Sequence, residues 1–422
     1  MLSRDDHDVV ERDPALPALA TLLDPAAFGA ALRESYPHLA VGDLTGWYLR
    51  YKPGTSCLAA FDAVLGGDRV ILHAITAADP IKLRRRRHDR TDHGLGAIRL
   101  GELPILVRGF PADGRLKSLG QLLDPARRAR MLPAAVAEGS LETIRYKPER
   151  RFVGRLTGAT GPFAVKLHAP GRIAAAADGA TAFRSEGALQ FAPVVHADEG
   201  LGIVVQRWMP GRLLADCQAD PEWDPREAQG LGQALAQLHA QRPRGIAPDP
   251  RPDGGLLELG ESLELLLPSL RGTARTHAAT LVGALHEIAE PDTVIHGDCY
   301  AKQILLDGPR ITVLDCDQAR AGDPAEDLGT FRAHLLRDVL RHRVTRERAD
   351  RIWDAVRSGY GASGGDWDLR IQLFTAIGCL RLGPDPFRHR EADWAEGTRA
   401  LVRLSLAAMA PILSGRPAAA WA

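Results

Sequence analysis

The sequence predicts an α+β protein in which two strand-rich units are followed by a helical one. Strand-like apolar runs occur twice in the same order, and from about residue 215 the apolar residues fall at helical spacing. One short strand–turn–strand segment, residues 293–317, interrupts the helical part. Because 422 residues are too many for a single core, we expect three domains. Their predicted bounds are 1–130, 131–214 and 215–422.

The composition restricts the class of protein. Lys plus Arg and Asp plus Glu both number 53, so the chain lacks the basic excess of nucleic-acid-binding proteins. The five cysteines are scattered with no CxxC pair, which favours a reducing compartment over a disulfide framework or a zinc site. The charged first residues are unlike a signal peptide, and no apolar run approaches the roughly 20 residues of a membrane span. We therefore expect a cytoplasmic protein with no membrane or nucleic-acid partner.

The first strand-rich unit is recognised by apolar runs on both sides of Gly66-Gly67, a pattern that predicts a β-hairpin. A further strand is expected from Leu103. The same order returns from Leu141, where two strand-like runs flank residues 158–161. RYKP and LHA occur in both copies, and VRGFPADGRL in the first parallels VQRWMPGRLL in the second. These matches predict an internal repeat of one strand-rich unit.

The two copies differ at one position that bears on chemistry. Lys166 lies in the middle of an apolar strand, where a lysine needs an acidic partner or an anion. Glu186, in the helix-like segment FRSEGALQFA, is the expected partner. Aligning the two LHA motifs puts Ile71 where Lys166 stands, with no clear counterpart of Glu186. We therefore interpret the first unit as a degenerate copy that acts as a cap or support.

The segment TVIHGDCYAKQILLDGPRITVLDCD, from Thr293, carries the strongest chemical pattern. Phosphoryl transfer needs a carboxylate to orient the attacking hydroxyl, oxygen ligands for Mg²⁺ and a cation on the phosphates. Asp298 follows the first apolar piece, Gln303 comes shortly after it, and Asp315 ends the last strand. A hairpin at the DGPR turn can bring these three side chains to one mouth.

This segment resembles the catalytic core of the aminoglycoside phosphotransferase and choline kinase family, which has a protein-kinase-like fold. The family pattern is HGDxxxxN, a hairpin, ID followed by an acidic position, and then GD and an Asp before an apolar residue. This sequence has HGDCYAKQ and then VLDCDQARAGDPAEDLG. The resemblance implies a two-lobed fold that binds ATP and Mg²⁺. It implies a catalytic base at Asp298, metal ligands at Asp315 and Gln303, and a brace for the catalytic loop at Asp327.

The resemblance extends to the second strand-rich unit. It implies that Lys166, paired with Glu186, holds the α- and β-phosphates and that the turn 148–151 covers them. GIVVQRWMPG looks like the hinge strand, on which adenine would contact backbone groups of Gln206, Arg207, Trp208 and Met209. Most members have Asn where Gln303 stands. Gln here, together with the extra N-terminal domain, resembles the maltokinase-like branch.

Three functions remain open from the sequence. The first is an enzyme, monomeric or homodimeric, that phosphorylates a hydroxyl of a small molecule such as a sugar, an aminoglycoside-like compound or another polyol. The second is a pseudokinase or nucleotide-binding scaffold, which Gln303 favours and which the presence of Asp298, Asp315 and Lys166 opposes. The third is a protein kinase, which the short segment between Asp315 and Asp327 disfavours.

Several residues also have a plain structural interpretation. Lys166 could extend its amine to solvent from an edge strand, and Glu186 could be an ordinary exposed residue. His296 is more often a loop anchor than an acid or base. Asp317 is equally compatible with a place near the metal and with a structural role. Tryptophans at helical positions, Trp353, Trp367 and Trp394, are more often core than substrate contacts.

Overall fold

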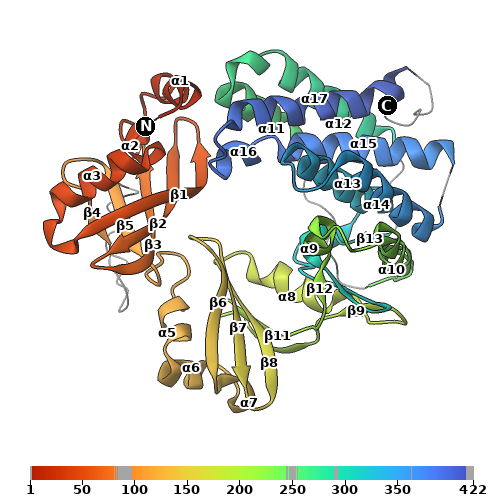
Figure 1. The fold of residues 1–422 in the computed structure, drawn as a ribbon, viewed down its shortest axis with the longest axis horizontal. Helices are drawn as coiled ribbons and strands as arrows, with labels where there is room; N and C mark the ends of the chain where they lie inside the picture. Colours follow the sequence, from red (N-terminus) through yellow and green to blue (C-terminus); the bar gives the residue numbers. More distant parts are fainter. Residues whose placement is uncertain are drawn as a thin grey trace.

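The computed structural model describes residues 2–79, 81, 83, 97–243, 246, 253, 255–288, 293–362 and 364–414. Figure 1 shows a sheet at each of two corners and a body of helices at the third. The predicted class, α+β with a strand-rich lobe, a helical lobe and an additional N-terminal lobe-like domain, is confirmed. None of the described helices combines the length and apolar character needed to cross a membrane.

The N-terminal sheet has the strand order β1-β2-β3-β5-β4 and is antiparallel. Its strands are β1 (Val41–Lys52), β2 (Ser56–Leu65), β3 (Asp68–Ala77), β4 (Ile98–Arg99) and β5 (Ile105–Gly109), and the helices before it are α1 (Arg4–Arg12), α2 (Leu19–Leu23) and α3 (Pro25–Ser35). Phe28 of α3 stacks on Phe61 of β2, with 4.4 Å between ring centroids. The hairpin predicted around Gly66-Gly67 is present as β2 and β3.

The second sheet has the order β10-β11-β8-β7-β6. Its strands are β6 (Ser140–Lys147), β7 (Arg151–Gly158), β8 (Gly161–His168), β10 (Val194–Asp198) and β11 (Ile203–Arg207), and α5 (Leu119–Leu123), α6 (Pro125–Met131) and α7 (Ala134–Ala137) precede it. Read from β6, this order matches that of the first sheet strand for strand. The internal repeat predicted from the sequence is therefore confirmed by topology.

The repeat begins earlier in each copy than the strands suggest. LLDP occurs at 22–25 and again at 122–125, and the Asp caps α3 in one copy and α6 in the other. Asp13 accepts hydrogen bonds from Tyr51 Oη (2.8 Å) and Gly54 N (2.9 Å). Asp113 accepts the equivalent pair in the second copy, from Tyr146 Oη (2.7 Å) and Glu149 N (2.7 Å). Each copy thus ties its first hairpin to an Asp before its helices.

The predicted boundary at residue 130 is wrong, because it falls inside α6. Leu119, Leu122 and Val136, on α5 and α7, pack in one core with Phe152 of the second sheet. Burial of these apolar side chains makes α5 to α7 part of the second unit. The division between the first two units therefore lies before Asp113.

Strand pairing also corrects the alignment of the two copies. Cys57 lies opposite Tyr51 as Phe152 lies opposite Tyr146, so the strands can be matched from this end. By that register Lys166, opposite Val153 and Val204, matches Ile75, opposite Leu58 and Leu106. The LHA match, which pointed to Ile71, fails because β2 and β3 are each ten residues long whereas β7 and β8 are eight. An apolar side chain still replaces the lysine: Ile75 is buried beside Tyr48, Leu58 and Ala60.

The helical region follows the second sheet. Its main helices are α9 (Leu214–Ala219), α10 (Gln229–Ala240), α11 (Leu256–Leu266), α12 (Thr273–His286), α13 (Pro324–Leu340), α14 (Arg346–Tyr360), α15 (Gly365–Leu382), α16 (Asp385–Arg388) and α17 (Trp394–Leu413). Trp353 and Trp394 are buried in its core, whereas the partly buried Trp367 stacks on Tyr360. The first unit shares this core, since Tyr51 of β1 packs on Phe387 of α16 and Asp6 of α1 accepts a hydrogen bond from Trp394 Nε1. Figure 1 shows β1 next to α16.

The predicted hairpin within the helical region is present as β14 (Ile304–Asp307) and β15 (Arg310–Val313). It forms a sheet of order β12-β14-β15-β9 with β12 (Arg212–Leu213) and β9 (Leu189–Phe191). Beside it, β13 (Val294–Ile295) pairs with β16 (Arg320–Ala321). The helix after β8 is α8 (Ile173–Ala182), so the helical interpretation of FRSEGALQFA is wrong. The alanine-rich run before it is the better helix former, and this segment turns at Gly187 into β9.

Candidate active site

The loop that carries Asp298 is fixed by one buried carboxylate. Asp327, in the first turn of α13, accepts hydrogen bonds from His296 N and Gly297 N, both at 2.8 Å, and is bonded to His239 Nε2 at 2.9 Å. Burial alone would raise its pKa, but these hydrogen bonds hold the pKa of Asp327 below its ordinary value. Gly297 has φ of +79°, and a Cβ there would lie 2.4 Å from Gln318 O. The surrounding backbone therefore restricts the conformation of this loop and requires glycine at position 297.

His296 joins this loop to the strand that ends at Asp315. Its Nδ1 accepts a hydrogen bond from Asp298 N (3.2 Å), and its Nε2 donates to Leu314 O (2.8 Å). A ring that carries a proton on Nε2 and accepts at Nδ1 makes both hydrogen bonds. The side chain is fully buried. His296 is thus placed as an anchor that sets the spacing between the two acidic segments.

Asp298 follows this anchor and faces a cavity. Burial raises its pKa to about 6, and the nearby Asp315 carboxylate adds to the rise, while His296, Lys147 and Arg151 oppose it. A carboxylate with a pKa near neutrality can accept a proton without being held permanently in either form. Asp298 therefore has the location and the ionisation of a general base.

Asp315, directly after β15, collects two cations and an amide. Lys166 Nζ lies 3.0 Å from its Oδ1, and Arg151 Nη1 lies 2.9 and 2.7 Å from its two oxygens. Gln303 Nε2 donates to Oδ2 at 3.3 Å. The backbone of Asp315 has φ of +62°, which a non-glycine residue adopts at a cost. The side chains of Lys166, Gln303 and Asp315, distant in sequence, are thus brought together.

Asp317 completes this charged group. Its carboxylate lies 3.8 Å from Lys166 Nζ and 3.3 Å from Arg151 Nη1. Burial works against the charge on Asp315, but Lys166 and Arg151 hold its pKa well below the ordinary range. Burial and the charge of Asp315 raise the pKa of Asp317 instead. Asp315 and Asp317 therefore face the two cations Lys166 and Arg151, and Asp315 is the carboxylate that stays ionised.

Asp315 and Gln303 are suitable ligands for Mg²⁺. This ion prefers oxygen ligands and is commonly held by one or two carboxylates together with substrate phosphates. Rotation of the Gln303 amide by half a turn presents its oxygen where the nitrogen now lies beside Asp315. Within the described part of the chain, no three His, Cys, Asp or Glu side chains form a metal-ligating group. The donor set thus suits a metal that phosphate oxygens complete.

The predicted pairing of Glu186 with Lys166 is wrong. Glu186 lies beyond the end of α8, is exposed, and exchanges backbone hydrogen bonds with Leu189. Its turn directs the chain into β9 and away from the second sheet. Asp315 and Asp317 supply the negative charge that Lys166 needs. Helix α8 packs directly on the backbone between Asp315 and Asp317, since a Cβ at Gly179 would lie 2.0 Å from Cys316 O.

The proposed hinge residues lie at the end of β11, but two of their N–H groups are already used. Arg207 N donates to Pro193 O (2.9 Å) and Trp208 N to Pro162 O (3.1 Å), so neither is free for adenine. Gln206 is buried and its Nε2 donates to Ala192 O (3.1 Å). The Arg207 side chain donates to Thr160 O, and Trp208 lies under the guanidinium of Arg155. Met209 lies after the end of β11, and nothing in its placement conflicts with the predicted contact to adenine.

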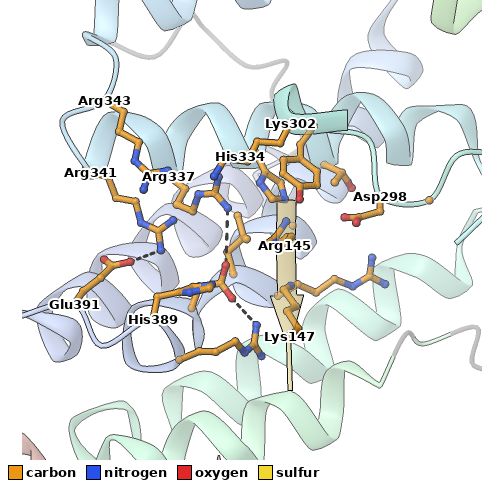
Figure 2. Close-up of a pocket in the computed structure, with 18 of the residues that line it drawn as sticks. Arg145, Lys147, Asp298, Lys302, His334, Arg337, Arg341, Arg343, His389 and Glu391 are labelled. Carbon is orange, nitrogen blue, oxygen red and sulfur yellow. Dashed lines mark hydrogen bonds and ion pairs between the residues drawn. The ribbon is translucent and has the colours of Figure 1, made fainter. Parts of the chain in front are cut away.

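A cavity of about 480 Å³ opens next to Asp298 on the side of the helical lobe. Figure 2 shows Arg145 and Lys147 on one strand, β6, with Arg337, Arg341 and Arg343 across from them and Asp298 at one side. Nine Lys or Arg residues and three Asp or Glu residues line it. These cations were not among the site residues predicted from the sequence, and neither was Arg151 as a partner of Asp315. The repeated RYKP was a signal for Arg145 and Lys147, but we used it only as evidence of the repeat.

The model of the family described as "Phosphotransferase enzyme family" matches residues 149–368, more than half of the chain. No curated protein matches the chain in a sequence search.

Similar solved structures include a choline/ethanolamine kinase family protein from Mesorhizobium loti. It is 18% identical, with 68% of this chain and 93% of that chain covered and a TM-score of 0.48. Another is a thermostable mutant aminoglycoside phosphotransferase in ternary complex with AMP-PNP and hygromycin B, with 15% identity, coverage of 63% and 93%, and a TM-score of 0.46. A third is an amicoumacin kinase in complex with AMP-PNP, Ca²⁺ and its ligand, with 16% identity, coverage of 65% and 89%, and a TM-score of 0.47.

The family match contains residues 149–151 of the turn, Lys166, the catalytic segment, α13, α14 and the first residues of α15. This match confirms the resemblance found in the sequence, and the strand-rich and helical lobes that it implied are both present. The chain belongs to the phosphotransferase enzyme family.

Proposed function

We propose that this protein transfers the γ-phosphoryl group of ATP to a hydroxyl of a small molecule, with Asp298 as the catalytic base. The observation that carries the proposal is the placement of Asp298 between two different surroundings. On one side lies the charged group around Asp315, and on the other lies the cavity in the helical lobe. A phosphoryl donor and an acceptor can therefore approach the same carboxylate from opposite sides.

Each side chain of the site has a distinct task in this proposal. Asp298 orients the acceptor hydroxyl and accepts its proton as the oxygen attacks the γ-phosphorus. Lys166 and Arg151 bind phosphate oxygens, for which they exchange part of their present contact with Asp315. Asp315 and Gln303 would hold Mg²⁺, which supplies charge neutralisation on the phosphates when bound. Asp327 and His296 keep the base in place.

A pseudokinase is the alternative function. Gln303 in place of Asn favours it, since the side chain is one methylene longer. Its contact with Asp315 at 3.3 Å opposes it, because the longer amide still reaches the carboxylate expected to share the metal. The pKa of about 6 at Asp298 also favours a working base over a scaffold residue.

The test compares wild type with Asp298→Asn in two assays. Thermal shift with AMP-PNP and Mg²⁺ is expected to show binding by both proteins. ATP turnover with a panel of neutral, anionic and cationic hydroxyl compounds is expected only from wild type. Equal turnover by the two proteins would refute the assignment of the base. Binding of nucleotide without turnover of any acceptor would favour the pseudokinase.

A further inference from the structure

The acceptor cavity has a strong excess of positive charge. Its lining contains nine Lys or Arg residues against Asp298, Asp385 and Glu391. Two acids just behind the wall, Asp338 and Glu326, reduce the excess but leave it at four, since nine cations face five carboxylates. The whole chain has no net charge, so this excess is local.

The paired cations account for the acidic residues. Arg337 and Arg343 share Asp338, at 3.0 and 3.8 Å, and Arg381 pairs with Glu326 at 2.7 Å. Arg341 pairs with Glu391, and Arg388 pairs with Asp385. These five arginines form one wall of the cavity, and carboxylates neutralise most of their charge. They supply shape and hydrogen-bond donors more than free charge.

Four cations of the lining have no such match: Arg145, Lys147, Arg150 and Lys302. Across the described ranges, no carboxylate lies within ion-pair distance of any of them. Lys147 and Arg150 are half-buried, while Arg145 and Lys302 are exposed at the rim. Burial and the neighbouring Arg145, Arg151 and Arg150 lower the pKa of Lys147 to about 8. Cations held together without a counter-charge are unfavourable, and an anion placed among them relieves this.

We propose that the acceptor is an anionic hydroxyl compound, most simply a phosphorylated polyol, whose anionic group is bound by Arg145, Lys147 and Lys302. The inference rests on the proposed function. Phosphate suits the site better than a single carboxylate, because it carries close to two negative charges and has three acceptor oxygens. Arg145 and Lys147 come from β6 and Lys302 from the segment after Asp298, so the anion is held on two sides (Figure 2).

The geometry separates this anion from the nucleotide. Lys166, Gln303 and Asp315 do not line the cavity, whereas Asp298 does. A hydroxyl on the bound anion can thus reach Asp298 while the phosphoryl donor stays beside Asp315. Arg150 lies in the β6–β7 turn, between the cavity and the Asp315 group, so it is left out of the test. A cationic acceptor such as choline or an aminoglycoside meets repulsion in this cavity.

Tyr300 and His334 add a neutral surface to the same wall. Their rings stack with 4.2 Å between centroids, and His334 Nδ1 is enclosed without a hydrogen-bond partner in the described structure. Burial and the adjacent Arg337 and Arg341 hold the pKa of His334 well below its ordinary value, so the ring is neutral. A ring face next to cations suits the carbon skeleton of a polyol whose charged end lies among the cations.

The experiment measures binding without catalysis. Isothermal titration calorimetry on the full-length Asp298→Asn variant, without nucleotide, would use glucose 6-phosphate, gluconate, glucose and choline as probes. The expected order is sugar phosphate first, gluconate second, and glucose and choline far weaker. Lys302→Ala and Arg145→Ala are each expected to weaken sugar phosphate binding about tenfold or more. Lys117→Ala and Arg310→Ala remove exposed cations outside the cavity and should leave it unchanged.

Several outcomes would overturn the inference. These are preference for glucose or choline over both anions, unchanged anion binding in both cavity variants, no anion binding at millimolar concentration, or displacement of the anion by AMP-PNP with Mg²⁺. Gluconate binding as tightly as the sugar phosphate would overturn the choice of phosphate. Circular dichroism and melting temperature verify that each variant is folded. Anion binding without turnover of any acceptor would refute the proposed function and leave the anion site standing. Turnover restricted to neutral or cationic acceptors would refute the anionic acceptor and leave the proposed function standing.

Discussion

Arg50 of the first unit forms an ion pair with Glu149 of the second, with 2.8 Å between Nη2 and Oε2. Arg50 opens the first RYKP motif, and Glu149 lies in the turn after the second. Glu149 is 1% exposed, adopts φ of +58°, and donates its N–H to Asp113. The next two residues, Arg150 and Arg151, face the cavity and Asp315 respectively. The degenerate unit therefore helps to hold the turn that brings these two arginines to the site.

Loss of this ion pair should loosen the turn. Arg50→Ala removes a cation that pairs with a buried carboxylate, so we expect a loss of about 1–3 kcal/mol in unfolding free energy. We also expect a several-fold rise in the KM for ATP, because Arg151 is then less well placed. Urea denaturation and steady-state kinetics measure the two effects. Arg50→Lys, which keeps the charge, should be milder, and an unchanged KM for ATP in Arg50→Ala would contradict this role.

The pH dependence should report Asp298. Only the ionised carboxylate can accept the hydroxyl proton, so kcat/KM is expected to rise through about pH 6 and to level off above it. For an anionic acceptor, activity should fall again as Lys147 loses its proton near pH 8. Kinetics between about pH 5 and 9 with a constant-ionic-strength buffer test this. Lys147→Arg should remove the upper limb only, and a profile that is flat across pH 6 would speak against Asp298 as the base.

Asp327 should contribute stability that depends on pH. Asp327→Asn retains one acceptor oxygen for three donors, and we expect a loss of about 2–4 kcal/mol at neutral pH. Since folding lowers the pKa of Asp327, its contribution is complete above the unfolded carboxyl value of about 3.9 and is lost as pH falls through the folded value. Denaturation at several pH values should therefore show the two proteins converging under acid conditions. A difference that grows toward low pH would show that the sign is wrong.

Gln303 should affect metal dependence more than nucleotide recognition. Gln303→Ala removes one expected oxygen ligand, so the Mg²⁺ concentration for half-maximal turnover should rise about tenfold. Nucleotide binding measured with EDTA present should stay unchanged. Gln303→Asn tests whether the shorter amide, which is commoner in the family, still reaches the metal. An unaltered Mg²⁺ dependence in Gln303→Ala would exclude this residue from the metal site.

Two helical glycines provide a matched pair for the contact between α8 and the Asp315 segment. A Cβ at Gly179 would lie 2.0 Å from Cys316 O, whereas a Cβ at Gly283 of α12 meets nothing within 4 Å. Gly283→Ala should stabilise the protein by about 0.5–1 kcal/mol through helix propensity. Gly179→Ala should destabilise it by more than that and lower kcat/KM, because Asp315 and Asp317 must shift. Thermal denaturation and steady-state kinetics of both variants test this. If the two variants have similar melting temperatures and kcat/KM values, the contact between α8 and the Asp315 segment can adjust to an added methyl group.

The catalytic segment could be predicted because its parts are close in sequence. His296 to Asp315 form one loop and one hairpin, so local pattern was enough to bring Asp298, Gln303 and Asp315 together. Lys166 was found because a lysine in an apolar strand needs an explanation. Glu186 was assigned wrongly because helix α8 ends at Ala182, before the segment that contains Glu186. The alanine-rich run that forms α8 was the local signal for the true helix.

The acceptor cavity could not be predicted from the sequence. Its cations come from β6 and the turn after it, the catalytic loop, α13 and the turn after it, α15 and α16, so no window of sequence contains them together. Their significance also depends on which of them lack acidic partners, and that is decided by packing alone. The maltokinase-like branch, the cytoplasmic location and the oligomeric state stay predictions.

The first sheet shares its hydrophobic core with the helices, while the second sheet has a core of its own. A rotation of the second sheet as a rigid body therefore disturbs few apolar contacts outside its own core. The first sheet cannot move in this way without breaking the hydrophobic core that it shares with the helices. We therefore expect the second sheet to move as one body relative to the first sheet and the helices when the site opens or closes around a nucleotide.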